Sequence, residues 1–167
     1  MTTHKYLPSF VCGFSAAVIS TIPGIRSIAC CFVVPAAAWF SLVLDHKINK
    51  AEPPVSVQNA LFFGLLTGLF AAIFSTGLDI LMTFIMHSND FVRSLPQTEI
   101  IARQWNLGDI WNQTQSLLRK MSADIKANGF SLTYSAAILF SNLIIDIVFG
   151  IIGGLLGMLI QNRKTIQ

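Results

Sequence analysis

Charged side chains are scarce in this sequence. Asp, Glu, Lys and Arg make up only 11% of its 167 residues, whereas apolar residues make up 53%. A soluble domain of this size usually carries roughly twice that charged share. The shortage argues against a soluble globular enzyme, a disordered protein or a nucleic-acid-binding module, and it favours a small integral membrane protein. The net charge of +3 is too small to indicate an acidic macromolecular partner.

Recognisable motifs for catalysis and metal binding are also lacking. The sequence has no paired His-Glu metalloprotease motif, no phosphate-binding glycine loop and no nucleophile elbow. Its three cysteines lie in apolar stretches, which favours packing over disulfides or metal ligation. We therefore predict a protein that is not an enzyme and holds no metal or cofactor. Whether His46 or His87, beside predicted spans, ligates a haem or pigment is left open.

Four apolar segments predict an all-α membrane protein with a four-helix bundle. A bilayer core of about 30 Å needs about 20 helical residues. The predicted spans cover residues 7–22, 27–44, 60–86 and 130–160, in a single membrane domain, 1–167. The first is short and the second contains Pro35, which we expect to kink it, so whether these two cross fully stays open. The fourth is long enough to tilt or protrude.

The connection between the third and fourth spans, residues 88–129, has the pattern of an amphipathic helical insert. After Pro96, apolar residues recur at helical spacing, and Gly108-Asp109 predicts a helix end followed by a new helix start. The second helix carries an apolar stripe: Ile110, Leu117, Leu118, Met121 and Ile125. Trp105, Trp111 and Leu118 are candidate contacts for a partner. The alternative, that the insert is a cap over its own bundle, has equal weight.

Cationic residues indicate the orientation. With both termini in the cytoplasm, five cations lie on three short cytoplasmic segments: Lys5, Lys47, Lys50, Arg163 and Lys164. The remaining cations lie mostly in the long connection, which translocates with little regard for charge. The sequence therefore predicts cytoplasmic termini in a bacterial inner membrane, with the insert outside.

Small residues recur every four positions on the third and fourth spans. Helices whose contact faces carry glycine or alanine can approach closely and gain dispersion contacts along their backbones. The pattern predicts that these two spans pack along a seam of small residues: Ala60, Gly64, Gly68, Ala72, Gly150, Gly153, Gly154 and Gly157.

Two aspartates lie on the same helix faces as the glycines. Asp79 follows Gly68 by eleven positions, which leaves an angular offset of only about 20° at 100° per residue. The same separation relates Asp146 to Gly157. Each carboxyl group is therefore predicted to face a neighbouring helix and not lipid.

An antiparallel alignment with Ala60 level with Ile160 predicts which polar residues meet. Asp79 then lies at the depth of Asn142, and Asp146 at the depth of two hydroxyl residues, Ser75 and Thr76. Ionisable residues inside spans are rare and often functional. The alternative is a pair of neutral carboxylic acids that hydrogen-bond across the seam.

Two functions of different class follow from these patterns. The first is a non-catalytic accessory or assembly subunit of a larger bacterial membrane complex, which binds other membrane subunits or further copies of itself. The second is a small oligomeric transporter or channel, coupled to protons or cations, that uses Asp79 and Asp146. Both readings place the protein in a lipid bilayer and neither involves nucleic acid.

The chain also resembles a known family. Two stretches carry the resemblance, Val55 to Gly68, which includes Ser56-Val57-Gln58-Asn59-Ala60, and Gly150 to Lys164, which ends in Gln161-Asn162-Arg163-Lys164. They are similar to the small four-span bacterial membrane proteins of the domain-of-unknown-function 4199 family. The resemblance implies an N-terminal hairpin, an extracytoplasmic helical insert and a bacterial inner-membrane setting. It implies no activity.

Overall fold

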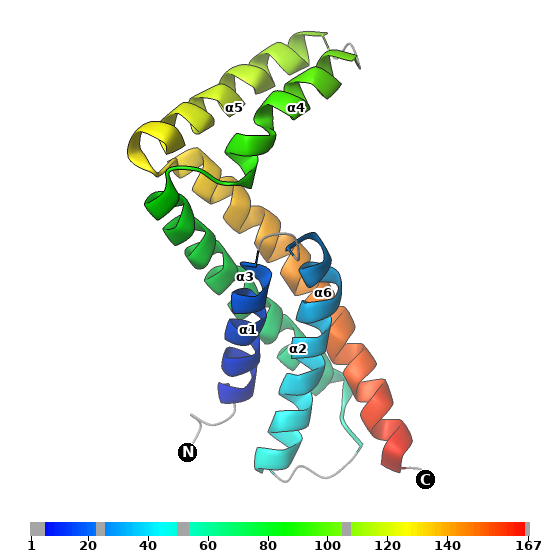
Figure 1. The fold of residues 1–167 in the computed structure, drawn as a ribbon. Helices are drawn as coiled ribbons and strands as arrows, with labels where there is room; N and C mark the ends of the chain where they lie inside the picture. The colour runs from blue at the N-terminus through cyan, green and yellow to red at the C-terminus, as the bar shows by residue number, and fades with distance from the viewer. Residues whose placement is uncertain (1–5, 23–25, 50–53, 105–107, 166–167) are drawn as a thin grey trace. The chain divides into compact units, whose positions relative to one another are not determined.

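The described residues of the chain are all helical or in turns. The computed structural model describes residues 6–22, 26–49, 54–104 and 108–165, and within these ranges there are six α-helices and no strand (Figure 1). The all-α prediction is confirmed. The helices are α1 (Leu7–Ser20), α2 (Arg26–Asn49), α3 (Val57–Met86), α4 (Asp90–Gln104), α5 (Gly108–Asn128) and α6 (Leu132–Thr165).

Three of these helices are long and apolar enough to cross a membrane. The qualifying segments are Cys31–Ile48 of α2, Val57–Met86, which is all of α3, and Leu132–Arg163 of α6. The chain therefore has the helices of a membrane protein. α1 is apolar but has only 14 residues, about 21 Å at 1.5 Å per residue, which is shorter than a hydrocarbon core of about 30 Å.

Helix bounds differ from the predicted spans mainly at the ends. Pro35 does not divide the second segment, since α2 continues through it to Asn49 with one internal proline. Proline has no N–H to donate, so α2 forgoes one i→i−4 hydrogen bond there. The N-terminus of α3 is extended to Val57, and the hydroxyl of Ser56 accepts a hydrogen bond from the N–H of Asn59 at 3.2 Å. Residues 23–25, between the first two predicted spans, lie outside the described residues.

The chain divides into two compact units. The first comprises Met1–Leu78 and Leu139–Gln167, and the second Asp79–Ile138. α1, α2 and most of α3 and α6 belong to the first unit, whereas α4, α5 and the adjoining ends of α3 and α6 belong to the second.

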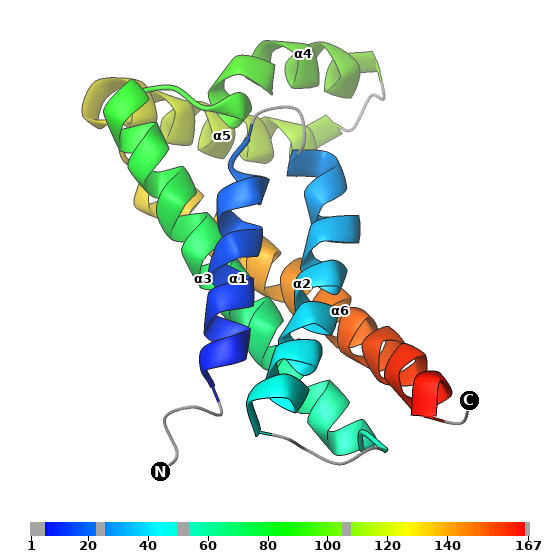
Figure 2. The same ribbon diagram turned by 60° about the horizontal axis from the view of Figure 1, so that its bottom comes forward.

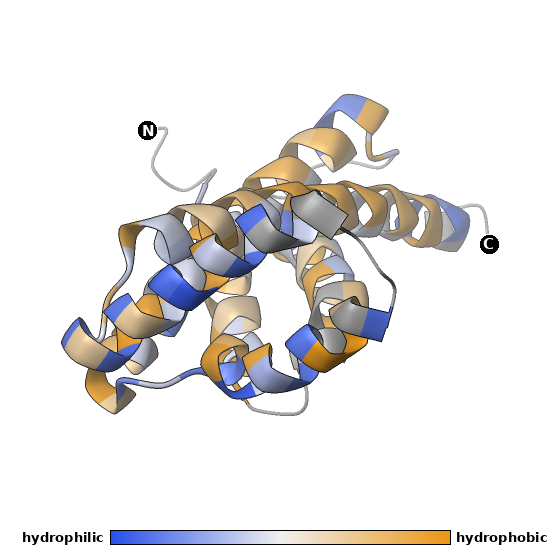
Figure 3. Ribbon diagram, turned by 90° about the horizontal axis from the view of Figure 1, so that it is seen from above, coloured by the Kyte–Doolittle hydropathy of each residue, from blue (hydrophilic) through white to orange (hydrophobic). Residues whose placement is uncertain are grey.

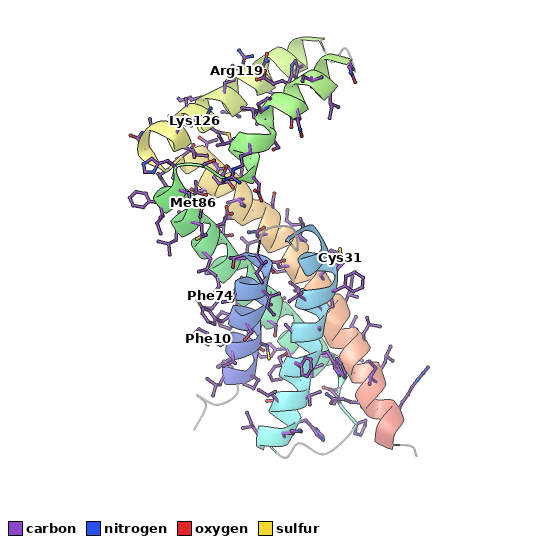
Figure 4. All side chains as sticks on the ribbon, in the orientation of Figure 1. Phe10, Cys31, Phe74, Met86, Arg119 and Lys126 are labelled. Carbon is purple, nitrogen blue, oxygen red and sulfur yellow. The ribbon has the colours of Figure 1, made fainter. Side chains whose placement is uncertain are left out.

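In the first unit, α1 packs against α3 through a close backbone approach and a set of aromatic rings. A Cβ atom at Gly13 would lie 2.7 Å from the Cβ of Phe70, so only glycine fits there. The ring of Phe10 meets the ring of Phe74 edge-on, with centroids 5.3 Å apart. Figure 4 shows these two side chains beside each other. Edge-on aromatic pairs contribute beyond their buried area, by about 0.5–1.5 kcal/mol.

The second unit has a small core of its own. Val92 of α4, Met121 and Ile125 of α5, and Tyr134 of α6 are buried together, with Phe91 and Ile138 packed around them. Two residues of the predicted apolar stripe, Met121 and Ile125, therefore face inward. Figure 2 shows α4 and α5 running side by side. In Figure 3 the ribbons of these two helices alternate between polar and apolar residues. The helix that ends at the C-terminus is instead apolar along most of its length.

The turn between α3 and α4 depends on two residues. His87 follows the last residue of α3 with a φ of +48°, in the left-handed region. Asn89 then caps α4, because its Oδ1 accepts the N–H of Val92 at 2.9 Å. The amide nitrogen of Asn89 donates to the hydroxyl of Thr83 at 3.3 Å, which ties the cap to the end of α3.

An ion pair joins α4 to α5 at the surface. The Nε and Nη2 atoms of Arg119 donate to the two carboxylate oxygens of Glu99 at 2.9 and 3.0 Å. The hydrogen bond, and then the negative charge of Glu99, raise the pKa of the Arg119 guanidinium. Figure 4 marks Arg119 on α5. The geometry fixes the pairing of the two helices more than it stabilises them, since the Arg119 side chain is exposed.

We predict that Gly129→Ala destabilises the second unit. Gly129 ends α5 with a φ of +70°, and an added Cβ would lie 2.7 Å from the carbonyl oxygen of Phe84. The left-handed conformation alone costs an L-residue about 1–2 kcal/mol. The measurement is thermal unfolding of the purified protein in detergent. His87→Gly is the comparison variant: it removes a side chain from a left-handed position but also the contact of the His87 ring with Phe84, so it should lose less stability than Gly129→Ala. Equal stability of Gly129→Ala and the parent would contradict the prediction.

Candidate functional site

The backbones of α3 and α6 meet directly at four glycines of the first unit. A Cβ atom at Gly64 would lie 2.5 Å from the carbonyl oxygen of Gly150 and 3.0 Å from the Cα of Ile151. Gly68 faces the backbone of Asp146, and Gly154 faces the backbone of Ala60. Any side chain at these positions would force the two helices apart, because the atoms in the way belong to the backbone and cannot move aside.

The other glycine pair of α6 packs against a different helix. Gly153 lies against the backbone of Pro35, and a Cβ at Gly157 would lie 2.7 Å from the indole ring of Trp39. Positions three apart on a helix differ by about 60° around its axis, so Gly150 and Gly153 face separate neighbours. α6 therefore contacts α3 with one glycine pair and α2 with the other. The sequence pattern identified both pairs but assigned both to contact with the third span.

Asn142 and Asp79, which the alignment places at one depth, each have a hydrogen-bond partner in their own unit. The amide nitrogen of Asn142 donates to the hydroxyls of Thr76 at 2.9 Å and of Ser75 at 3.4 Å. The expected partners of Asp146 are thus bound to Asn142. In the second unit, Asp79 accepts a hydrogen bond from the hydroxyl of Tyr134 at 2.9 Å.

The register of the α3–α6 contact is the physical reason that Asp146 accepts no hydrogen bond from Ser75 or Thr76. Ala60 lies opposite Gly154 and not opposite Ile160, a displacement of between one and two helical turns. The alignment was chosen by equal depth at a membrane boundary. The observed register instead brings Gly64 opposite Gly150 and sets Gly68 and Gly154 against the opposing backbone, where a side chain would keep the helices apart.

Asp146 is the exception among these polar groups. Its side chain is only 7% exposed, and no residue in the described part of the chain donates a hydrogen bond to its carboxyl group. Burying a charged carboxylate without a partner is very costly, so such a group is neutralised or binds a cation. This makes the neighbourhood of Asp146 the strongest candidate site in the first unit.

Two further polar contacts inside the first unit were missed from the sequence. The hydroxyl of Thr67 on α3 donates to the hydroxyl of Ser41 on α2 at 3.0 Å, with both residues buried. The side-chain amide of Asn162 makes two hydrogen bonds to the backbone of Val55, at 2.9 and 3.2 Å. Their only sequence signal was a polar residue in, or at the end of, an apolar segment, and nothing in the sequence indicates which residue is the partner.

The predicted partner contacts on the insert are only half accessible. Trp105 lies outside the described residues, and Trp111 and Leu118 are half-buried. The large apolar side chains that α4 and α5 do expose are others: Ile100 is 60%, Ile101 54% and Leu117 47% exposed.

No metal-binding group is found among the described residues, since nowhere in those ranges do three His, Cys, Asp or Glu side chains come close enough to hold a metal ion.

Comparison of the chain with family models, curated proteins and solved structures finds no match.

We predict that Gly68→Leu and Gly154→Leu destabilise the protein by about 1–3 kcal/mol, as overpacking does elsewhere. Both positions face backbone across the α3–α6 contact. Gly77→Leu is the matched control on the same helix, because a Cβ at Gly77 meets nothing within 4 Å. The measurement is the unfolding temperature in detergent. If all three variants have the same unfolding temperature as the parent, the glycine contact is not a structural constraint.

We predict that Tyr134→Phe costs about 0.5–1 kcal/mol, the size of a hydrogen bond between membrane helices. Asp79→Asn keeps an acceptor for the Tyr134 hydroxyl and should cost less. Because both variants act on one hydrogen bond, the double variant should lose less stability than the sum of the two single losses. Strict additivity in a double-mutant cycle, measured by denaturant unfolding, would count against this contact.

Proposed function

We propose that this chain is a non-catalytic accessory or assembly subunit of a larger bacterial membrane protein complex. The observation that supports this proposal is the exposure of Ile100, Ile101 and Leu117 on α4 and α5. The second unit has its own buried core, so these aliphatic side chains are left over after it has folded. Exposed apolar side chains that form one patch mark contact sites with other proteins or with membranes, and the proposal assigns these three to such a patch.

The proposal includes a topology. α1, α2, α3 and α6 would lie in the inner membrane with both termini in the cytoplasm, and α4 and α5 would form the extracytoplasmic insert. This arrangement is also what the resemblance to the domain-of-unknown-function 4199 family implies. α1 would enter the bilayer as the short arm of the N-terminal hairpin.

We predict the labelling pattern that this topology requires. In a background without native cysteines, single cysteines at Thr2, Asn49 and Thr165 should resist a membrane-impermeant thiol reagent in intact cells, and a cysteine at Gln113 should react. Gln113 is chosen because its side chain is exposed on α5. If the cysteine at Thr165 reacts in intact cells and the cysteine at Gln113 does not, the orientation is opposite to the proposed one.

We predict that a mild-detergent purification retains other membrane proteins in fixed ratio, as shown by native mass analysis. Ile100→Glu with Ile101→Glu should release them, because a charge at an apolar contact must be desolvated on binding. Gln97→Glu, on the exposed surface of the same helix, adds a charge as well and serves as the control. A pure homo-oligomer that the double variant leaves intact would contradict the accessory-subunit proposal.

A second function, cation- or proton-coupled transport by an oligomer, is favoured by one observation, the buried Asp146 carboxyl group that has no donor in the described ranges. Intramembrane ionisable residues often mark ion pathways. Asp146→Asn should then fold normally and abolish flux in liposomes, because an amide neither ionises nor carries charge. Asp79→Asn, whose parent carboxyl already has a hydrogen-bond partner, is the matched control and should retain flux.

A further inference from the structure

We propose that Asp146, Asn142, Ser75 and Thr76 form a binding site for one small monovalent cation, Na⁺, at the α3–α6 contact. The inference rests on the transport function proposed second above and names its ion. It does not depend on whether the chain also joins a larger complex.

Three of these side chains are joined by hydrogen bonds across the helix contact, and the fourth, Asp146, lies one turn along α6 from Asn142. Asn142 and Asp146 are one turn apart on α6, so their Cβ atoms are about 5–6 Å apart. Side chains on a helix tilt toward its N-terminus, which directs the Asp146 carboxyl group toward the turn that carries Asn142. Asn142 in turn is held against Ser75 and Thr76 by its two hydrogen bonds. Across from Asp146, Gly68 presents only backbone.

The chemistry of this cluster suits a hard cation. It offers carboxylate, amide and hydroxyl oxygens, which are the ligands that hard cations prefer. Asn142 uses its amide nitrogen to bond the two hydroxyls, which leaves its carbonyl oxygen as an acceptor. Thr76 is buried and Ser75 half-buried, so an ion bound here would be largely shielded from water.

The charge balance selects a monovalent ion. Asp146 is the only Asp or Glu of the first unit's described part of α3 and α6, so one positive charge neutralises the site. A divalent ion would leave an unpaired positive charge in an apolar contact, which is very costly. The close backbone approach at Gly68 leaves little room, which favours a small ion. Asp79 belongs to the second unit, where it accepts the Tyr134 hydroxyl, and the proposal assigns it no role as a ligand.

The test is Na⁺ binding by the purified full-length protein in detergent at fixed pH. NaCl is titrated against choline chloride at constant ionic strength, and both the unfolding temperature and the retention of radioactive Na⁺ are measured. The parent should gain several degrees of stability with Na⁺ and retain about one ion per chain, because a ligand that binds only the folded state stabilises it. Asp146→Asn should lose both effects, and Asp79→Asn should keep both.

Thr76→Val provides a second test if Asp146→Asn does not fold. It keeps the shape of the side chain but removes one oxygen ligand, so Na⁺ affinity should fall by about tenfold or more. No retained Na⁺ and no Na⁺-dependent shift in the parent would overturn the proposal, as would an equal shift in Asp146→Asn or a response to pH alone. Na⁺ binding without flux in liposomes would contradict the proposed transport function but would support the proposed binding site.

Discussion

The packing of the first unit depends on how closely the backbones of α3 and α6 approach. At Gly64, Gly68, Gly150 and Gly154 the space for a Cβ atom is occupied by the opposing backbone. Lipid chains are as apolar as leucine side chains, so apolar burial alone does not hold membrane helices together, and dispersion between closely packed backbones has to do so. Because each of these glycines lies directly against the opposing backbone, the contact also fixes which residues of the two helices lie opposite each other.

That register decides which polar side chains meet. Asn142 bonds Ser75 and Thr76, which the depth-matched alignment places within one helical turn of it, whereas Asp146 lies against the backbone of Gly68. A polar group inside a membrane segment costs free energy unless it is hydrogen-bonded. Thr67 and Ser41 satisfy this requirement between α3 and α2. Asp146 does not satisfy this requirement within the described residues. Hydrogen bonding between helices therefore accounts for the presence of Asn142, Ser75 and Thr76, but it does not account for the presence of Asp146.

The second unit is built on different principles. Its turns depend on capping and on left-handed residues, at His87, Asn89 and Gly129, and its core on ordinary burial of apolar side chains. Its surface ion pair sets the pairing of α4 with α5. The exposed Ile100 and Ile101 have no such local explanation, which is why they support the proposed contact with another membrane protein.

The sequence by itself determined the helical class, the three long apolar helices, the positions of the small residues and the inward-facing Met121 and Ile125 of α5, because each is a local pattern with the period of a helix. It also located α5 near Gly108 and the end of that helix near Gly129. It matched Ser75 and Thr76 to Asp146, whereas Asn142 bonds them, and it could not assign Gly153 and Gly157 to α2. Periodicity fixes the angle of a residue around its own helix. The relative shift of two helices along their axes depends on which backbones can touch, and only the tertiary structure decided that.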